Sequence, residues 1–501
     1  MPLFRKVLVA NRGEIAVRII RTCRAMGLPT VAVYSDADRS ARHVLEADES
    51  EAIGPAEALH SYLSIDALID AARRSGADAV HPGYGFLSEK GDFADAVRDA
   101  GLTFVGPPGE VHRAMGDKRG ARRLMASAGV PVLPGYDGDD QSDARLLSEA
   151  EAMGWPVMLK PSRGGGGKGM RVVRGAADFA SALGASRRES MAAFGDDTMV
   201  IERFVERPRH VEVQVVADGE GKVLHLGERE CSVQRRHQKV VEETPSPALT
   251  PDQREALCAA GVAAARAASY LNAGTVEFLL APDGAFSFLE MNTRLQVEHP
   301  VTEAVTGIDI VRLQLEVAAG RPLALEQKHV AGRGHALECR LYAEDPERDD
   351  LPSPGRVLHL SEPEGPGIRV DSALAAGSEV TVHYDPLLSK IVTWGLDRRE
   401  AIERMREALR RTVVLGVVTN LARLRAIVEH PAFEEGALHT GFIEEHLSER
   451  TPGPGPPIEA VAAVAAALSR VDPRGPQGSE AGRATPDPWT NLGPWRLGEG
   501  T

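Results

Sequence analysis

The stretch Lys160-Pro161-Ser162-Arg163-Gly164-Gly165-Gly166-Gly167-Lys168-Gly169 is the sharpest local signal in this chain of 501 residues. Four consecutive glycines let backbone N–H groups approach an anion closely and line a concave nest. Lys160 and Lys168 add positive charge on either side. The pattern is not a P-loop, and it lies between two predicted strands rather than before a helix. We interpret it as a phosphate-covering flap; a mobile linker hairpin is the alternative.

The segment before the flap alternates short apolar strands with helices. Strands are predicted at 6–10, 29–34, 77–81 and 102–105, and helices at 14–26, 66–74 and 93–100. This βαβ series predicts a mostly parallel sheet with both faces covered. The first turn, Asn11-Arg12-Gly13-Glu14, holds one glycine where a dinucleotide site needs three, which excludes NAD or FAD. The turn at residues 81–86 is either a ligand loop at a strand's carboxyl end or a tight loop without a ligand.

A second signal follows the flap, in a predicted hairpin formed by residues 275–279 and 286–290. With Asp283-Gly284 as its two-residue turn, Glu277 lies directly opposite Glu290, with Cβ atoms about 5 Å apart. Opposed carboxylates repel unless a cation lies between them, and their oxygens suit Mg²⁺ or Mn²⁺. The alternative is a single carboxylate with a raised pKa.

Polar side chains alternate after this hairpin, at Glu290, Asn292, Arg294, Gln296 and Glu298. While the chain stays extended, all five point to the same side. A solvated outer face would show the same alternation. We favour the interpretation that these side chains line a site for a small anion and include a base. The row starts at the proposed metal-binding acid Glu290 and continues with amide, guanidinium, amide and carboxylate groups, which is not typical of a salt-bridged surface.

Four potentially cationic side chains cluster at Gln234-Arg235-Arg236-His237-Gln238-Lys239 in an acidic chain. No aromatic residues are interleaved, which disfavours a nucleic-acid patch. A solvated charge run remains an alternative to the anion pocket fed by Lys239 that we favour. Glu202 either accepts a hydrogen bond from an adenine amino group or pairs with Arg203, and His210 is equally ambiguous.

The composition is that of a soluble globular protein, with 43% apolar residues, 26% charged residues and a net charge of −14. Such an acidic chain is poorly suited to general nucleic-acid binding. The sequence contains no run of about 18 apolar residues, so we predict no membrane-spanning helix. Four widely spaced cysteines and no evident signal peptide lead us to expect a cytoplasmic protein. Only nine of the 58 basic residues are lysines, so a lysine indicates a place that needs a compact point charge.

Five motifs in one order give the chain its resemblance to the biotin carboxylase component of biotin-dependent carboxylases, an ATP-grasp fold. Beside the flap and the cluster 234–239, they are Ala10-Asn11-Arg12-Gly13-Glu14-Ile15-Ala16, His81-Pro82-Gly83-Tyr84-Gly85-Phe86-Leu87-Ser88-Glu89 and Glu290-Met291-Asn292-Thr293-Arg294. The resemblance covers about residues 3–447. It implies a combined α/β and α+β fold: an N-terminal parallel α/β domain, a central ATP-grasp domain with a flexible lid, and a C-terminal mixed α+β domain.

The resemblance implies ATP- and bicarbonate-dependent carboxylation of biotin at N1′, the first half-reaction of an acyl-CoA carboxylase. Implied ATP contacts are Lys118, Lys160, Gly164, Gly165, Gly166, Gly167, Glu202, His210, Gln234 and His237. Implied ligands of Mg²⁺ or Mn²⁺ are Glu277, Glu290 and Asn292. Implied bicarbonate and biotin contacts are Lys239, Arg294, Gln296, the Val297 backbone, Glu298, Arg340 and Tyr84. Of these, Glu298 corresponds to the general base and Arg340 to the group that stabilises the biotin enolate, with Arg294 and Lys239 also catalytic.

Domains are predicted at 1–114, 115–325 with a lid at about 133–204, and 335–447, before a Pro/Gly/Ala-rich, flexible tail at 450–501 with a short helix near 458–468. No lysine has methionine on both sides, as a biotinylation site would. We therefore expect biotin on a separate carrier protein, with carboxyltransferase subunits and a second copy in a homodimer as further partners, unless this chain is truncated. The acyl acceptor stays open among acetyl-CoA, as in fatty acid biosynthesis, propionyl-CoA, methylcrotonyl-CoA and pyruvate.

Two other functions compete with this interpretation. One is another ATP-grasp ligase, which activates a carboxylate for attack by an amine. The other is a catalytically silent ATP-binding scaffold, against which intact Glu298, Arg294 and Lys239 argue. Pro161 departs from the family pattern, where a small residue is expected, and removes one backbone donor beside the flap.

Overall fold

A computed structural model describes residues 3–163 and 167–447 of the chain. Met1–Glu449 forms one compact unit. Gly164, Gly165, Gly166 and the tail at 450–501, with its predicted helix, lie outside the described residues. Helices within the described ranges are too short or too polar to cross a bilayer.

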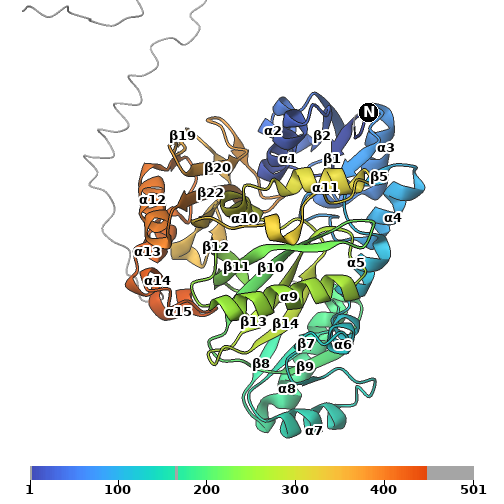
Figure 1. The fold of residues 1–501 in the computed structure, drawn as a ribbon, viewed down its shortest axis with the longest axis vertical. Helices are drawn as coiled ribbons and strands as arrows, with labels where there is room; N and C mark the ends of the chain where they lie inside the picture. Colours follow the sequence, from blue (N-terminus) through green and yellow to red (C-terminus); the bar gives the residue numbers. More distant parts are fainter. Residues whose placement is uncertain (1–2, 164–166, 448–501) are drawn as a thin grey trace, which may run out of the picture. The chain divides into compact units, whose positions relative to one another are not determined.

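A five-stranded parallel sheet begins the chain, as predicted (Figure 1). In spatial order its strands are β3 (Glu49–Gly54), β2 (Thr30–Ser35), β1 (Val7–Val9), β4 (Ala79–His81) and β5 (Thr103–Phe104). The accompanying helices are α1 (Gly13–Ala25), α2 (Arg42–Glu46), α3 (Ile65–Ser75) and α4 (Gly91–Asp99). All three residues of β1 are fully buried, because the central strand of a parallel sheet is covered on both faces.

Two elements of this part escaped prediction. β3 is an edge strand in which Ile53 is the one buried residue, so its sequence carries almost no apolar signal. α2 is five residues long and buries His43 alone. β3 lies at the edge of the sheet, and α2 packs against α1 and β2.

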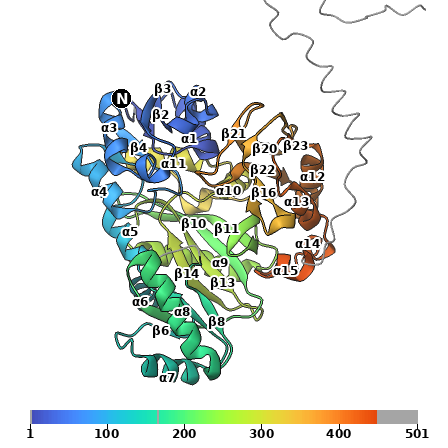
Figure 2. The ribbon, with the colours of Figure 1, turned by 180° about the vertical axis from the view of Figure 1, so that it is seen from behind.

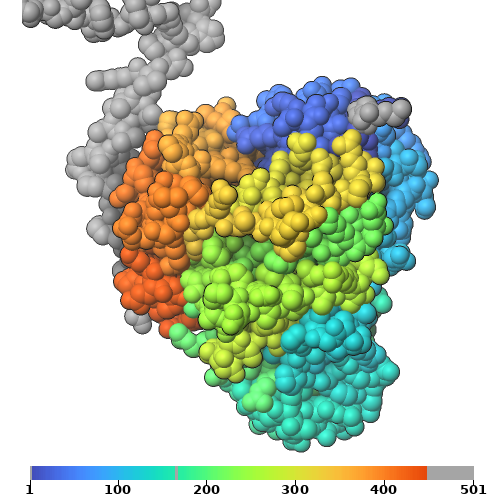
Figure 3. Space-filling model, viewed as in Figure 1, coloured from blue at the N-terminus to red at the C-terminus, as the bar shows by residue number. Residues whose placement is uncertain are grey.

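The flap belongs to a separate four-stranded antiparallel sheet. Its order is β6 (Gly135–Tyr136), β9 (Met199–Arg203), β7 (Val157–Pro161) and β8 (Arg171–Val173), and its helices are α7 (Asp143–Met153) and α8 (Ala176–Phe194). Lys160 lies near the end of β7, so the flap connects two strands as predicted. Pro161 is the last residue of β7, where the missing donor does not interrupt the strand. In the space-filling view this layer projects below the rest of the described chain (Figure 3).

An eight-stranded antiparallel sheet forms the remainder. Its order is β14 (Phe286–Asn292), β13 (Asn272–Leu280), β10 (Arg209–Ala217), β11 (Val223–Arg235), β12 (Gln238–Thr244), β15 (His335–Tyr342), β22 (Leu387–Gly395) and β20 (Ile368–Ser372). β12 was not predicted: Arg236 and His237, both at positive φ, form the turn of a hairpin inside the basic cluster. Because β12 pairs with β15, one sheet runs through the predicted boundary near residue 330.

Helices cover this sheet on both sides (Figures 1 and 2). They are α5 (Gly109–Gly116), α6 (Lys118–Ser127), α9 (Pro251–Ala267), α10 (His299–Thr306), α11 (Ile310–Ala318), α12 (Arg398–Arg411), α13 (Leu421–Val428), α14 (Pro431–Glu434) and α15 (Phe442–Leu447). Short strand pairs complete the C-terminal part: β16 (Glu344–Asp345) with β17 (Leu351–Pro352), β18 (Gly355–Arg356) with β21 (Glu379–Val380), and β19 (His359–Ser361) with β23 (Val413–Leu415). α10 packs against β11, β12, β15 and β22, and so carries its N-terminus to the middle of the sheet.

Three buried histidines should make the N-terminal part sensitive to acid. Burial lowers the pKa of His43 and His112 to about 4 and that of His81 to about 3. The unfolded chain takes up these protons near pH 6.5, whereas the folded protein does not. The unfolding free energy should therefore fall as the pH drops from about 6.5 to about 4, by about 3 kcal/mol per histidine. Urea unfolding of the wild type and of His43→Gln tests this; equal pH slopes in the two proteins would contradict it.

Candidate active site

One cavity collects most of the residues singled out in the sequence. It measures about 290 Å³ and lies where β7 meets the β11–β12 hairpin, β14 and the turn that follows β14. The residues that line it include many that the sequence analysis assigned to the site: Lys118, Lys160, Gly167, His210, Gln234, His237, Lys239, Glu277, Glu290, Asn292, Arg294, Gln296, Val297 and Arg340. Groups assigned to nucleotide, metal and bicarbonate therefore share one space.

Three predicted residues lie elsewhere. Glu202 lines a smaller adjoining cavity together with Lys118 and Lys160. Glu298 is completely buried behind the cavity wall. Tyr84 lines neither cavity and packs against the core around β1 and α1.

Glu277 and Glu290 lie directly opposite each other on β13 and β14, as predicted. The predicted turn is wrong, because the loop 281–285 replaces the two-residue Asp283-Gly284 turn. A bulge between Glu277 and Phe278 shifts the register by one residue and restores the pairing of the two acids. Burial and the neighbouring Glu277 raise the pKa of Glu290, while Lys118 lowers it.

The polar row after β14 converges, but not along an extended strand. β14 ends at Asn292, and the chain folds back over Glu277 before α10 begins at His299. Glu277 Oε1 accepts hydrogen bonds from Asn292 Nδ2 at 2.8 Å and from Gln296 Nε2 at 3.0 Å. Arg294 in turn donates to the side-chain oxygens of Asn292 and Gln296, both at 3.2 Å. The alternation of polar residues correctly predicted that these side chains lie together. They are brought together by the loop after β14, however, and not by an extended strand.

Lys239 on β12 joins three carboxylates from different elements. Its Nζ donates to Glu212 Oε2 at 2.5 Å, Glu298 Oε1 at 2.6 Å and Glu277 Oε1 at 2.7 Å. Burial alone would lower the pKa of Lys239, but the three carboxylates outweigh it and raise that pKa well above its usual range. Lys239 is therefore held as a compact cation, the charge that a bicarbonate or phosphate oxygen requires.

Glu298, at the N-terminus of α10, is held as an anion. Arg340 Nη2 donates to Glu298 Oε2 at 2.9 Å, and Arg340 Nε donates to Glu242 Oε1 at 2.6 Å. Burial would raise the pKa of Glu298, but Lys239 and Arg340 outweigh it and hold that pKa below its usual range. The carboxylate becomes a stronger base if either cation turns toward a bound anion.

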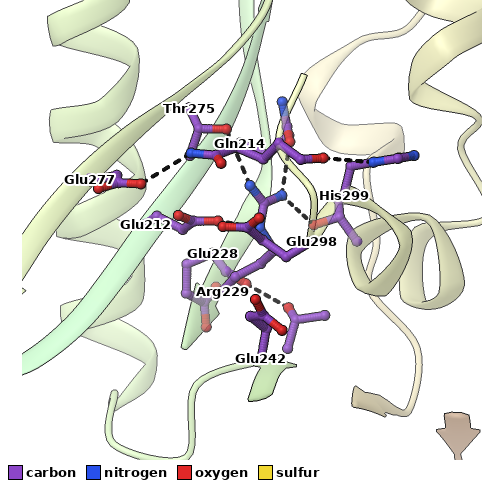
Figure 4. Close-up of polar contacts among 12 residues, drawn as sticks. Glu212, Gln214, Glu228, Arg229, Glu242, Thr275, Glu277, Glu298 and His299 are labelled. Carbon is purple, nitrogen blue, oxygen red and sulfur yellow. Dashed lines mark hydrogen bonds and ion pairs between the residues drawn. The ribbon is translucent and has the colours of Figure 1, made fainter. Parts of the chain in front are cut away.

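A layer of buried polar residues that the sequence analysis missed supports these groups (Figure 4). Arg229, which is 0% exposed, donates from Nε to Glu212 Oε1 at 2.5 Å and from Nη1 to Gln214 Oε1 at 2.8 Å. Its remaining donors reach Thr302 and Thr275. Glu212 and Gln214 alternate with valines along β10, and this alternation is the signal that could have revealed a polar face.

The end of the cavity near the flap is cationic. Lys160 Nζ lies 2.5 Å from Glu202 Oε2, and Arg122 Nη1 lies 3.2 Å from Glu202 Oε1. Glu202 thus pairs with these two residues and not with Arg203, the partner considered from the sequence. Gly167, at φ +74°, lies so close to the His237 ring that an added Cβ would be 2.8 Å from it. Only glycine fits there without displacing the histidine.

A parallel α/β domain, two antiparallel sheets and a cavity that joins flap lysines to paired carboxylates define an ATP-grasp ligase. Three sequence profiles match in order: "Biotin carboxylase, N-terminal domain" at residues 3–112, "Carbamoyl-phosphate synthase L chain, ATP binding domain" at 117–326 and "Biotin carboxylase C-terminal domain" at 338–445. The chain belongs to the biotin carboxylase family.

Relatives agree with this assignment. The chain is 50% identical to the biotin carboxylase of Allochromatium vinosum over 446 residues, which are 89% of this chain and 99% of that protein. It is 47% identical over 498 residues to the mitochondrial methylcrotonoyl-CoA carboxylase subunit alpha of Dictyostelium discoideum, covering 98% of this chain and 70% of the relative. The corresponding mouse subunit is matched over 62% of its length, so these carboxylase subunits are longer than this chain.

Solved structures show the same fold. A dimer of the biotin carboxylase domain of Hydrogenobacter thermophilus 2-oxoglutarate carboxylase, in complex with MgADP, ADP and bicarbonate, gives a TM-score of 0.85 at 44% identity, covering 88% of this chain and 98% of that one. A nucleotide complex of Campylobacter jejuni biotin carboxylase gives 0.86 at 42% identity, covering 88% and 99%.

Proposed function

We propose that this chain carboxylates biotin on a carrier protein, using ATP and bicarbonate and releasing ADP and phosphate. The observation that carries the proposal is the contact of Lys239 with Glu298 and Glu277 at one cavity wall. It brings a base, a cation and a metal-binding acid together beside Arg294 and Arg340. The Hydrogenobacter relative, solved with MgADP and bicarbonate, supports this pairing of substrates.

In the first step a bicarbonate oxygen attacks the γ-phosphorus of ATP, ADP leaves, and the remaining bicarbonate proton passes to Glu298. Lys239 and Arg340, which both line the cavity, would donate to the incoming anion. As they turn toward it, their hold on Glu298 weakens and the pKa of that carboxylate rises toward its usual range. The product, carboxyphosphate, hydrolyses easily, so a flap that excludes water over Lys160 is useful.

In the second step, carboxyphosphate breaks down to CO₂ and phosphate, and the phosphate takes the N1′ proton of biotin. The resulting enolate attacks CO₂ while Arg340 stabilises its oxygen. Arg340 lines the cavity and is anchored by Glu242 and Glu298.

The paired acids fit a divalent cation. Glu277 and Glu290 offer opposed carboxylates, and Asn292 offers an amide oxygen beside them. These three residues would hold Mg²⁺ or Mn²⁺, which prefer oxygen ligands of this kind. A cation there offsets the negative charge of the triphosphate.

Glu290→Gln should separate metal binding from stability. Mg²⁺ affinity, measured by calorimetric titration of the nucleotide-bound protein, should fall at least about tenfold, because one charged ligand is lost. The metal-free protein should unfold at an equal or higher temperature, since the repulsion from Glu277 and the cost of burying Glu290 both disappear. Asp283→Asn, an exposed acid in the loop of the same hairpin, is the matched control. Unchanged Mg²⁺ affinity in Glu290→Gln would remove Glu290 from the metal site.

The activity test measures ADP formation with bicarbonate, with and without free biotin. We expect stimulation by biotin and none by amines. A rival ligase that activates a carboxylate for amine attack would show the opposite pattern. A folded, metal-supplied sample without biotin stimulation would refute the proposed function.

We further propose a separate biotin carrier protein, carboxyltransferase subunits and a homodimer as partners, the last supported by the dimer of the Hydrogenobacter domain. The chemistry proposed for this chain ends at carboxybiotin. Choice of the acyl acceptor therefore falls to the carboxyltransferase.

A further inference from the structure

Lys390 on β22 is a buried cation that the mechanism above does not use. Its side chain is 0% exposed. Its Nζ donates to the backbone carbonyl of Val297 at 3.0 Å and lies 3.2 Å from Glu14 Oε2. Val297 lies in the turn between β14 and α10, directly before Glu298. An ammonium group is thus attached to the peptide that carries the proposed base.

The negative partner of Lys390 comes from the far end of the sequence. Glu14 lies in the first turn of α1, inside the motif at residues 10–16, and is 4% exposed. Asp371 also lies near, at 3.9 Å, but it already receives two hydrogen bonds from Arg369. Glu14 is therefore the nearer of the two carboxylates; burial raises its pKa to about 7, although Lys390 lowers it.

Strand register places Lys390 beside Arg340. The two residues are directly paired across β15 and β22, so their side chains leave the sheet on the same face. Arg340 reaches the side chain of Glu298, and Lys390 reaches the carbonyl of the preceding residue. The neighbouring strands β15 and β22 thus both bind the Val297–Glu298 segment, β15 through the Glu298 carboxylate and β22 through the Val297 carbonyl.

Burying an ammonium group costs several kcal/mol unless it is well paired. An apolar residue at position 390 would fill the space without this cost, as the buried neighbour Ile391 does on the other face. A lysine here is explained by the bond that it makes to Val297, a bond that an apolar side chain cannot make.

We propose that Lys390 is a positioning residue for the carboxylation reaction: it fixes the Val297–Glu298 peptide through its bond to the Val297 carbonyl, and Glu14 offsets part of the cost of burying the ammonium group. This inference rests on the proposed role of Glu298 as the base. The inference also connects the motif at residues 10–16 to the site, because Glu14 belongs to that motif and lies beside Lys390.

The test compares three full-length variants with the wild type: Lys390→Met, Glu14→Gln and the double variant E14Q/K390M. Lys390→Met leaves Glu14 buried without a partner, so its unfolding temperature should fall. The double variant carries neither charge, so its unfolding temperature should return toward that of the wild type. Biotin-dependent ADP formation is then measured with varied bicarbonate and varied ATP.

The double variant should lose about 100-fold in turnover or raise the KM for bicarbonate by a similar factor, because a small displacement of the base is enough. Its KM for ATP should stay within about twofold. Glu14→Gln retains the bond to Val297 and should keep turnover within about threefold of the wild type. A double variant as active as Glu14→Gln would overturn the inference. A 100-fold loss in a Glu14→Gln variant that unfolds at the wild-type temperature would also overturn it, since Glu14 would then act on the reaction without disturbing Lys390; this comparison holds even if Lys390→Met and the double variant fail to fold. A wild type without biotin stimulation would refute the proposed function instead.

Discussion

Glu298→Gln should lower biotin-dependent ADP formation by about 10² to 10⁴-fold and leave the dissociation constant of MgATP within about twofold. The amide keeps the size of the side chain and one acceptor oxygen, but it cannot take the proton that bicarbonate loses. Glu298 contacts Lys239 and Arg340 and is not among the residues that line the cavity with Lys118 and Lys160. Nucleotide binding should therefore be nearly unchanged. Initial rates and equilibrium titration of MgATP check the two halves of this expectation.

The matched control is Glu316→Gln on α11, where the carboxylate pairs with Arg312 one helical turn away. This variant should keep both turnover and nucleotide affinity. If Glu298→Gln loses nucleotide affinity in proportion to turnover, Glu298 supports the ATP site and is not the base. Retained turnover in Glu298→Gln would assign the proton to another acceptor.

Lys239→Met should have the largest effect on the folded protein, lowering the free energy of unfolding by about 3–5 kcal/mol and abolishing turnover. The substitution leaves the buried carboxylates of Glu212, Glu277 and Glu298 without their common cation. Arg229 and Arg340 still compensate part of that charge, so we expect destabilisation rather than complete unfolding. Urea unfolding and turnover assays measure the two effects.

Lys222→Met is the control for Lys239→Met, because Lys222 Nζ donates to the backbone carbonyl of Leu323. Its loss should cost about 1 kcal/mol and leave turnover unchanged. Adding Glu212→Gln to Lys239→Met should restore part of the stability and none of the activity. Full turnover of Lys239→Met would show that the cation is structural.

Local periodicity predicted the fold wherever apolar residues repeat at a regular spacing. β1, β2, β4 and β5 carry such patterns, and their parallel arrangement followed from the helices between them. β12 was hidden because its first residues, Gln238 and Lys239, continue a charged cluster that resembles a loop. The sheet that joins β12 to β15 depends on pairing between residues about 100 positions apart, which local patterns do not encode.

The site was predictable where its residues share one hairpin. Glu277 and Glu290 could be paired from the sequence because their register depends on a nearby turn. The loop is longer than predicted, but a bulge shifts the register back by one residue, so the two acids still pair. Arg229 and Lys390 could not be placed, since their partners come from distant strands and helices. The scarcity of lysines indicated that Lys390 needed a reason, but only the structure shows Val297 and Glu14 beside it.

The central claim is that the cavity brings bicarbonate to the γ-phosphate of ATP. The most direct measurement supplies ¹⁸O-labelled bicarbonate with MgATP and biotin and determines the isotope content of the phosphate formed, before the label exchanges with solvent. Attack by a bicarbonate oxygen predicts one ¹⁸O atom in each phosphate. Phosphate without label would mean that water attacks ATP, and would contradict the account of the site.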